Sequence, residues 1–512
     1  MISSLFTFPA RRRRICTHLR GLLLIFGAVL LGACGSSSSD DGSTVSNTPN
    51  PVVDGPIAGT PTLLGTTSFK LADVGYEQRE YFLSGSARSF ASANGQAEDG
   101  KWYVHAVDTA AYKTRILVYR PIDPAAFNGT VIVEWINVSG GPDTAAEWLM
   151  SHTEMIRKGY VWVGVSAQSA GIEGGGVNFS GQQLDLKTVN PQRYGSLSHP
   201  GDKYAFDIFS QAAQAVLHPQ GVNPLAGLDV QHALAVGVSQ SADFMVTYLD
   251  AIAKQAHLFD GYLVHSRFRG TVGLSPAALT SEGTDFLARP TVFIRDDVGV
   301  PVMEVETETD VLTFGNYTER QPDTDNFRLW EIAGTAHADI YNAQSGLADK
   351  GDDPAIAAVV EQDFPLFGCT VPVNSGPQHF VANSAIAALN SWVSDGVAPP
   401  YADRLQLNAE DTAFVFDSAG NVLGGIRTPY VDVPVAKLSG QGQLAGSDLL
   451  CTLFGSTALF DSTELMGLYP DHATFVSETD AAVNSAINAG FLLQTDGDLI
   501  KTWASGSSYG TY

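Results

Sequence analysis

Short apolar runs alternate with helical segments along the middle of this chain. Runs typical of strands buried on both faces lie at residues 129–136, 160–165, 233–238, 261–265, 301–305 and 327–332. Apolar residues at helical spacing lie at residues 144–156, 204–217, 242–256 and 380–393. A helix that connects two strands returns the chain to the same end of the sheet, so the strands run parallel. The sequence therefore predicts an α/β fold with a mostly parallel central sheet and helices on both faces.

Residues 1–33 have the pattern of an export signal. Arginines at positions 11–14 and 20 precede an apolar run at residues 21–31. That run is too short to cross a bilayer core of about 30 Å as a helix, but it has the length of the hydrophobic part of a signal peptide. It ends at Leu31-Gly32-Ala33-Cys34, which resembles the bacterial lipobox. We expect cleavage before Cys34 and attachment of a lipid to its thiol, after export by either the general or the twin-arginine route.

Composition divides the rest of the chain into three parts. Residues 34–60 begin with a run of serines, which is typical of a flexible tether. Residues 61–400 hold the predicted sheet, including an alternating stretch at 112–120 that suits an edge or antiparallel strand. Residues 401–512 carry fewer strand signals. We expect them to form a C-terminal extension packed on the core, and whether this extension forms a lid stays open.

The chain is acidic, with a formal net charge of −25 at pH 7. The predicted signal segment contains five arginines and no acidic residue, so its removal leaves a net charge of −30. Nucleic acid and anionic lipid headgroups are poor partners for such a surface. We therefore expect no nucleic-acid partner, and membrane contact only through the lipid on Cys34. The expected location is the bacterial cell envelope, with the outer membrane favoured, and the oligomeric state stays open.

Of the four cysteines, two are available for a structural role. Cys16 leaves with the signal segment and Cys34 is the lipidation site, so Cys369 and Cys451 remain. In an oxidising compartment we expect a disulfide between these two, with a pair of buried thiols as the alternative. The sequence contains neither C-x-x-C nor H-E-x-x-H. We therefore expect no catalytic metal and no cofactor.

The best candidate for a nucleophile is Ser239. It follows the predicted strand at residues 233–238 and precedes a predicted helix, within Gly237-Val238-Ser239-Gln240-Ser241. A serine at such a turn is held in a strained conformation with its hydroxyl exposed, and a glycine two residues earlier permits the tight turn. The usual motif is G-x-S-x-G, so Ser241 is a departure, although serine is nearly as small as glycine. The alternative is a plain turn that caps a helix.

A serine hydroxyl needs a general base, and His337 is the favoured candidate. It lies on a glycine-containing loop directly after the predicted strand at residues 327–332, from which it can reach over the end of the sheet. His379, which opens a predicted helix, is the second choice. His265, at a strand end, is expected to be structural.

The acid that orients the imidazole should come from the end of the preceding strand, at residues 301–305. Asp310 lies at a suitable distance past that strand. Glu308 is the alternative, because a glutamate orients an imidazole equally well. Glu304 and Glu306 alternate with apolar residues, which predicts that they face solvent.

Two backbone amides are candidates for an oxyanion hole. One belongs to Gln240, at the start of the helix after the serine, where the helix dipole favours negative charge. The other belongs to Val138 or a neighbour, on a glycine-rich loop that follows the strand at residues 129–136, and a plain turn is the alternative there. Candidates for lining a substrate pocket are Trp135, Gln168, Tyr194 and His199. Their segments should lie near the carboxyl edge of the sheet, and core packing is the alternative for each.

These segments resemble a bacterial α/β-hydrolase-domain family within the esterase and lipase superfamily. The matching motifs are Glu134-Trp135, Asn137-Val138-Ser139-Gly140-Gly141, Arg193-Tyr194-Gly195-Ser196-Leu197, His199-Pro200-Gly201-Asp202, the Ser239 motif, Ala333-Gly334-Thr335-Ala336-His337-Ala338-Asp339, Gly376-Pro377-Gln378-His379 and Gly424-Gly425-Ile426-Arg427-Thr428-Pro429. The resemblance implies an α/β-hydrolase fold and a serine carboxylic-ester hydrolase that acts on a small-molecule or polymeric ester. An amidase or peptidase on the same triad, and a non-catalytic surface lipoprotein that binds a ligand, are the alternatives.

Overall fold

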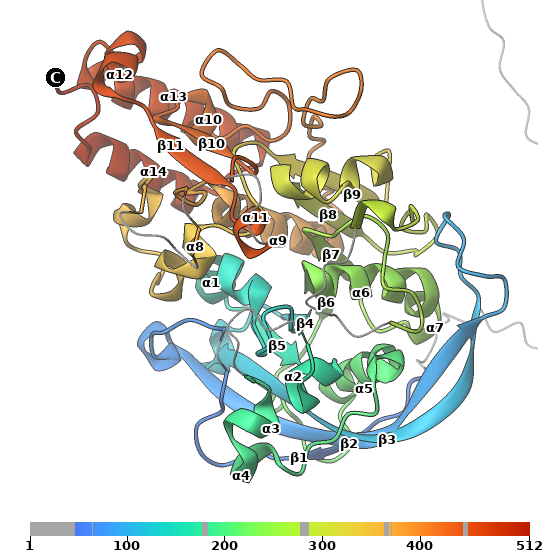
Figure 1. Ribbon diagram of the computed structural model, residues 1–512. Coiled ribbons are helices and arrows are strands. Elements are labelled where there is room, and N and C mark those ends of the chain that lie inside the picture. The colour runs from blue at the N-terminus through green and yellow to red at the C-terminus, as the bar shows by residue number, and fades with distance from the viewer. Residues whose placement is uncertain are drawn as a thin grey trace, which may run out of the picture. The chain divides into compact units, whose positions relative to one another are not determined.

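The computed structural model describes residues 47–63, 65–176, 183–276, 286–362, 368–369, 371–443 and 449–512 (Figure 1). Every described residue belongs to one compact unit, which spans residues 45–512. The predicted signal segment 1–33, Cys34 and the first part of the predicted tether lie outside the described residues. No helix in the described ranges is long and apolar enough to cross a membrane.

A nine-stranded sheet forms the centre of the fold, in the order β1-β2-β3-β5-β4-β6-β7-β8-β9. Its strands are β1 (Val52–Asp54), β2 (Tyr76–Ser92), β3 (Val104–Pro121), β4 (Thr130–Trp135), β5 (Val161–Val165), β6 (His232–Val238), β7 (Gly261–His265), β8 (Val302–Thr307) and β9 (Phe327–Ile332). Neighbours from β5 to β9 are parallel, whereas the pairs β1–β2, β2–β3 and β3–β5 are antiparallel. The prediction of an α/β fold with a mostly parallel sheet is confirmed.

Helices cover both faces of this sheet. The helices are α1 (Ala146–Lys158), α2 (Ser169–Glu173), α3 (Leu186–Val189), α4 (Pro191–Tyr194), α5 (Ala205–Leu217), α6 (Gln240–Tyr248), α7 (Lys254–Ala256), α8 (Ile340–Ala343), α9 (Gln378–Asp395), α10 (Pro429–Asp432), α11 (Leu449–Leu453), α12 (Ser462–Leu468), α13 (His472–Ala489) and α14 (Gln494–Gly506). Successive residues of a strand point to opposite faces. Val133 of β4 therefore packs in the core that contains α5 and α6, while Ile132 packs in the core that contains α1 and α9.

Two long antiparallel strands, β2 and β3, extend along one side of the sheet (Figure 1). The sequence pattern indicates only residues 112–120 of this hairpin, because most of residues 105–110 in β3 are exposed and show no alternation. β1 also pairs with β2, although its residues 52–54 lie in the stretch predicted as a tether. A strand of three residues is too short to show a recognisable alternation of apolar and polar residues in the sequence. The folded unit therefore begins before the predicted boundary at residue 61.

The C-terminal residues belong to the same compact unit as the sheet. Ile426 continues the sheet past β9, because its amide donates to Glu331 and its carbonyl accepts from the Ala333 amide. A separate hairpin of β10 (Ala436–Ser439) and β11 (Ser456–Leu459) follows. Its segment reaches the loop after β9, where Ala338 N donates to the carbonyl of Leu453 at 3.0 Å.

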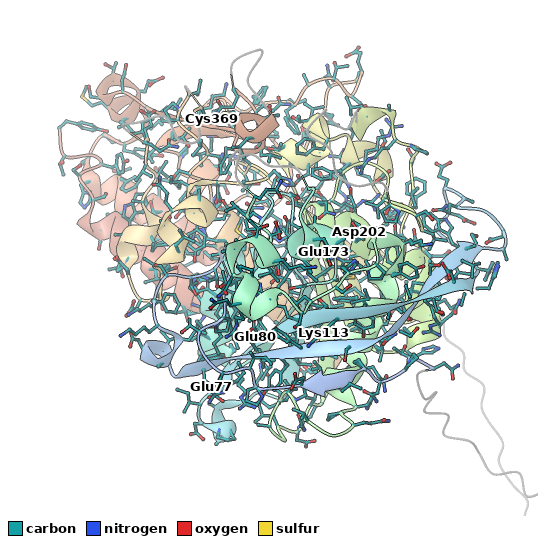
Figure 2. All side chains as sticks on the ribbon, turned by 60° about the horizontal axis from the view of Figure 1, so that its bottom comes forward. Glu77, Glu80, Lys113, Glu173, Asp202 and Cys369 are labelled. Atoms are coloured by element: carbon teal, nitrogen blue, oxygen red, sulfur yellow. A yellow bond between two sulfur atoms is a disulfide. The ribbon has the colours of Figure 1, made fainter. Side chains whose placement is uncertain are left out.

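Cys369 and Cys451 form a disulfide, as the cysteine count predicts. Both are buried in one small apolar cluster with Ile340, Val373 and Phe454, and Cys369 is labelled in Figure 2. The bond joins the chain before α9 to α11. These are the segments that lie against the loop after β9.

Removing this disulfide is expected to destabilise the folded protein. The bond spans 82 residues of sequence, and the chain-entropy model gives about 4–5 kcal/mol for a loop of that length. The double variant Cys369→Ala/Cys451→Ala should therefore have a lower Tm. A reductant should lower the Tm of the wild type but not that of the variant. Equal Tm values for the two proteins would contradict this expectation.

Candidate active site

Ser239 lies at the turn between β6 and α6, at the carboxyl end of the sheet. Its backbone has φ 60° and ψ −128°, a conformation that residues with a side chain rarely adopt. A Cβ atom at Gly237 would lie 2.5 Å from the carbonyl oxygen of Ser241, so the turn requires glycine there. The Ser239 amide is held by the carbonyl of His265 at 2.9 Å. The neighbouring strands thus fix a strained serine in one position.

Ser241, which replaces the second glycine of the usual motif, supports the turn. Its Oγ donates to the carbonyl of Val238 at 2.8 Å and lies 3.1 Å from the Val238 amide, which donates to it. The side chain is fully buried. Because this hydroxyl is engaged inside the turn, Ser241 is not a competing nucleophile in this structure.

The structure brings Ser239, His337 and Asp310 into one hydrogen-bonded chain. His337 Nε2 lies 2.7 Å from Ser239 Oγ, and His337 Nδ1 lies 2.5 Å from Asp310 Oδ1. The three residues follow β6, β9 and β8, whose carboxyl ends share one edge of the sheet. The Phe268 ring stacks on His337 at a centroid distance of 5.3 Å, and the Phe314 ring lies nearly perpendicular to it at 5.4 Å, so two aromatic rings help to hold the imidazole.

The second oxygen of Asp310 is occupied by Thr307. The Thr307 amide and hydroxyl both donate to Asp310 Oδ2, at 2.8 and 2.6 Å. This leaves Oδ1 to face His337. Thr307 is not among the residues predicted from the sequence, although a hydroxyl residue three positions before an acid is a common local hydrogen-bonding pattern.

Glu308, the alternative acid, faces away from the imidazole. Its carboxylate accepts from the amides of Gly334 and Gly440, at 2.6 and 2.8 Å. The next residue, Thr309, accepts from the His337 amide at 3.2 Å and donates to the Gly440 carbonyl at 2.6 Å. Glu308 and Thr309 therefore join the loop that carries His337 to the C-terminal segment.

The pH dependence of stability should reveal the burial of Glu308. Burial raises its pKa from 4.5 to about 7, against the lowering effect of its two amide donors. The protonated form then contributes stability that is fully present below pH 4.5 and is lost as the pH rises through 7. A shift of this size corresponds to about 3 kcal/mol at most. Between pH 5 and pH 8 the wild type should lose more Tm than Glu308→Gln, whose side chain does not titrate, and equal losses would contradict the assignment.

Glu304 and Glu306 are fully buried, so the prediction that they face solvent is wrong. They lie on β8, which is flanked by β7 and β9 and covered on both faces. Glu304 accepts from the side chain of Asn316 at 3.0 Å. Burial and the neighbouring carboxylate of Asp310 raise the pKa of Glu306 well above its usual range.

His379, the second choice for the base, is enclosed away from Ser239. Its ring stacks on Tyr341 with a centroid distance of 3.7 Å, and neither ring nitrogen has a hydrogen-bond partner within the described part of the chain. Burial, and to a smaller degree the nearby His152, lower the pKa of His379 to about 3. It is therefore a neutral core residue near neutral pH.

The two oxyanion candidates lie just after the ends of two adjacent strands, β4 and β6. Gln240 is the first residue of α6, so its amide has no acceptor within the helix. Val138 follows β4, which pairs in parallel with β6. The side chain of Asn137 crosses between the two segments and donates to the carbonyl of Val238 at 2.9 Å. Sequence reasoning identified the loop but not the bridging role of Asn137.

The structure places Trp135 and Gln168 in the core rather than on a pocket wall. The Trp135 ring packs among Phe206, Phe209 and Phe244 and is fully buried. Its indole nitrogen donates to Gln168 Oε1 at 3.1 Å. Trp135 is the last residue of β4 and still inside the sheet, so its side chain points into a helix layer instead of past the strand end.

Tyr194 and His199 are also buried and hydrogen-bonded to other parts of the fold. The Tyr194 hydroxyl is 2.9 Å from Glu80, which is labelled in Figure 2, and 3.1 Å from Nη1 of the buried Arg115. His199 Nε2 lies 2.8 Å from the carbonyl of Ala167, and its Nδ1 accepts from the Gly201 amide at 3.1 Å. Both ring nitrogens of His199 are therefore engaged by backbone groups, and a pocket-lining role for Tyr194 and His199 stays a prediction.

Within the described residues, no group of three or more His, Cys, Asp or Glu side chains could hold a metal ion. The hydrogen-bonded chain of serine, histidine and aspartate is complete by itself for activating a hydroxyl nucleophile.

A family model described as "Alpha/beta hydrolase domain" matches residues 53–502. Among solved structures, acetyl xylan esterase 1 from Thermoanaerobacterium sp. JW/SL YS485 is similar at 10% identity and a TM-score of 0.28, covering 56% of this chain and 82% of that chain. A fungal esterase from Rhizomucor miehei is similar at 10% identity and a TM-score of 0.29, covering 61% and 85%. No curated protein matches this sequence significantly.

Proposed function

Because this chain belongs to the alpha/beta hydrolase domain family, we propose that it is a serine carboxylic-ester hydrolase that works through an acyl-enzyme. The observation that carries the proposal is the unbroken chain of Ser239, His337 and Asp310, with contacts of 2.7 and 2.5 Å, which begins at a strained serine. Backbone strain of this kind is common at functional sites. The substrate is proposed to be a small-molecule or polymeric ester.

The chemistry follows from the order of these contacts. Ser239 Oγ attacks the acyl carbonyl while its proton passes to His337 Nε2, and Asp310 stabilises the resulting imidazolium through Nδ1. The amides of Gln240 and Val138 are proposed to bind the oxyanion of the tetrahedral intermediate. His337 then protonates the leaving alcohol, which departs and leaves the acyl group on Ser239. Water, deprotonated by His337, releases the acid and restores the serine.

Active-site labelling tests this proposal. The purified protein is treated with a fluorophosphonate, and the modified peptide is identified by mass spectrometry. We expect modification at Ser239 in the wild type and in Ser241→Ala, and no modification in Ser239→Ala. Labelling at Ser241, or no labelling of the wild type, would refute the assignment. Parallel assays with matched p-nitrophenyl esters and p-nitroanilides would separate an esterase from an amidase.

We further propose that the protein is an exported bacterial lipoprotein, anchored through Cys34 in the cell envelope. The support is the order of arginines, a short apolar run and Leu31-Gly32-Ala33-Cys34 in the sequence. Expression in a bacterium with radiolabelled palmitate should label the wild type but not Cys34→Ala. Label in both proteins would contradict the proposal.

A further inference from the structure

Asn137 is the side chain that connects the two segments carrying the proposed oxyanion amides. It follows β4 and is 7% exposed. Its Nδ2 donates to the carbonyl of Val238, 101 positions along the chain, at 2.9 Å. That carbonyl belongs to the peptide immediately before Ser239. From the end of the neighbouring strand β4, Asn137 therefore helps to hold the turn that contains Ser239.

The other end of the same carboxamide shapes the loop. Asn137 Oδ1 accepts from the Ser139 amide at 2.8 Å. The backbone of Asn137 is paired with Thr144 in both directions, at 3.0 and 2.8 Å. The amides on both sides of Val138 are thus engaged, whereas the Val138 amide has no hydrogen-bond acceptor among the described residues.

The Asn137 side chain connects β4 and β6 beyond their last backbone pair. The last backbone pair between β4 and β6 is Trp135 with Gly237. Beyond it the chains diverge, one toward Val138 and the other toward Gln240. The Asn137 carboxamide spans the gap at that point, and Ser241 Oγ donates a second hydrogen bond to the same Val238 carbonyl at 2.8 Å. One buried amide side chain therefore joins the two segments that contain the candidate donors.

On the basis of the proposed function, the geometry points to Asn137 as a positioning residue that fixes the distance between the Val138 and Gln240 amides. It touches neither the substrate nor the reacting atoms. Oxyanion stabilisation depends on donors held in place before the charge develops, and misplacement by about 1 Å lowers turnover by roughly 100-fold. Asn137 therefore acts on the transition state more than on substrate binding.

The test compares Asn137→Ala, the isosteric Asn137→Asp, and Asn128→Ala. Asn128 is a matched control because its Oδ1 also accepts from an amide two residues later, that of Thr130 at 2.9 Å, at the opposite end of β4. Rates are expressed per active site titrated with fluorophosphonate. Asn137→Asp keeps the acceptor for Ser139 but sets an oxygen against the Val238 carbonyl, so it provides a second variant if Asn137→Ala folds poorly.

We expect both Asn137 variants to lose about 10- to 100-fold in kcat, with KM within about threefold of the wild type. The rate constant for fluorophosphonate labelling should fall in parallel, because that reaction also develops charge on an oxygen. Asn128→Ala should behave as the wild type. A kcat per active site within twofold of the wild type in Asn137→Asp would overturn the inference. An unlabelled, inactive wild type would instead refute the proposed function itself, and the inference with it.

Discussion

Replacing His337 with alanine is expected to lower kcat/KM for an ester by about five to six orders of magnitude, as loss of the catalytic histidine does in the serine protease subtilisin. In this structure His337 Nε2 is the only ring nitrogen within hydrogen-bond distance of Ser239 Oγ among the described residues. Without it, the hydroxyl keeps its proton near neutral pH and attack on a carbonyl is slow. Steady-state hydrolysis of a p-nitrophenyl ester measures the effect.

A suitable control is His257→Asn. His257 is exposed after α7 and has φ 46°, a conformation that asparagine tolerates better than most residues. This variant should keep the wild-type rate. A loss below about 100-fold in His337→Ala would mean that another group serves as the base, since a positioned base alone contributes at least that much.

The second large effect is expected at Asp310. The change Asp310→Asn preserves size but replaces the acceptor of the His337 Nδ1 proton, and we expect kcat to fall by about 10⁴-fold near neutral pH. The reason is the tautomer of the imidazole, because an amide that donates to Nδ1 leaves the proton on Nε2. A protonated Nε2 would then lie next to Ser239 Oγ and could not accept the proton of the serine hydroxyl.

Glu308→Gln is the comparison that decides between the two acids. Glu308 contacts Gly334 and Gly440 rather than the imidazole. Replacing Glu308 with glutamine removes one of the two acceptors that hold the Gly334 and Gly440 amides. We therefore expect kcat to fall by less than about tenfold at pH 8. A loss of that size fits a small shift of the loop that contains His337 and is far below the loss expected when the catalytic acid is missing. A larger loss in Glu308→Gln than in Asp310→Asn would reverse the assignment of the acid.

The sequence pattern predicts the parallel strands well because each is short, apolar and bounded by turns. The strands at residues 261–265 and 327–332 have the predicted bounds. Their order in the chain also places Ser239, Asp310 and His337 at one edge of the sheet. Local sequence patterns therefore predict those features of the site that follow from the order of the strands.

The pattern fails where burial is decided by distant segments. Glu304 and Glu306 alternate with apolar residues as a half-exposed strand would, yet β8 is covered on both faces and Asn316 supplies a partner for one of them. Trp135 is a second example, because it was expected to line a pocket and is instead buried. A strand-end residue can point either past the sheet or into a helix layer, and only the three-dimensional packing of Phe206, Phe209 and Phe244 decides it.

Supporting contacts are the hardest features to predict. Thr307 next to Asp310 has a local signature, but the contact of Asn137 with Val238 joins residues 101 positions apart. Nothing in the spacing of either residue indicates that their strands are adjacent, since β4 and β6 are separated in sequence by β5 and α5.

The most direct test of the central claim is the pre-steady-state hydrolysis of p-nitrophenyl butyrate by the purified protein and by Ser239→Ala prepared in the same way. We expect the substrate to acylate Ser239 of the wild type and to release p-nitrophenolate, with a burst that matches the concentration of active sites if deacylation is the slower step. We expect only background hydrolysis from Ser239→Ala. Equal rates for the two proteins would contradict the assignment of Ser239 as the nucleophile.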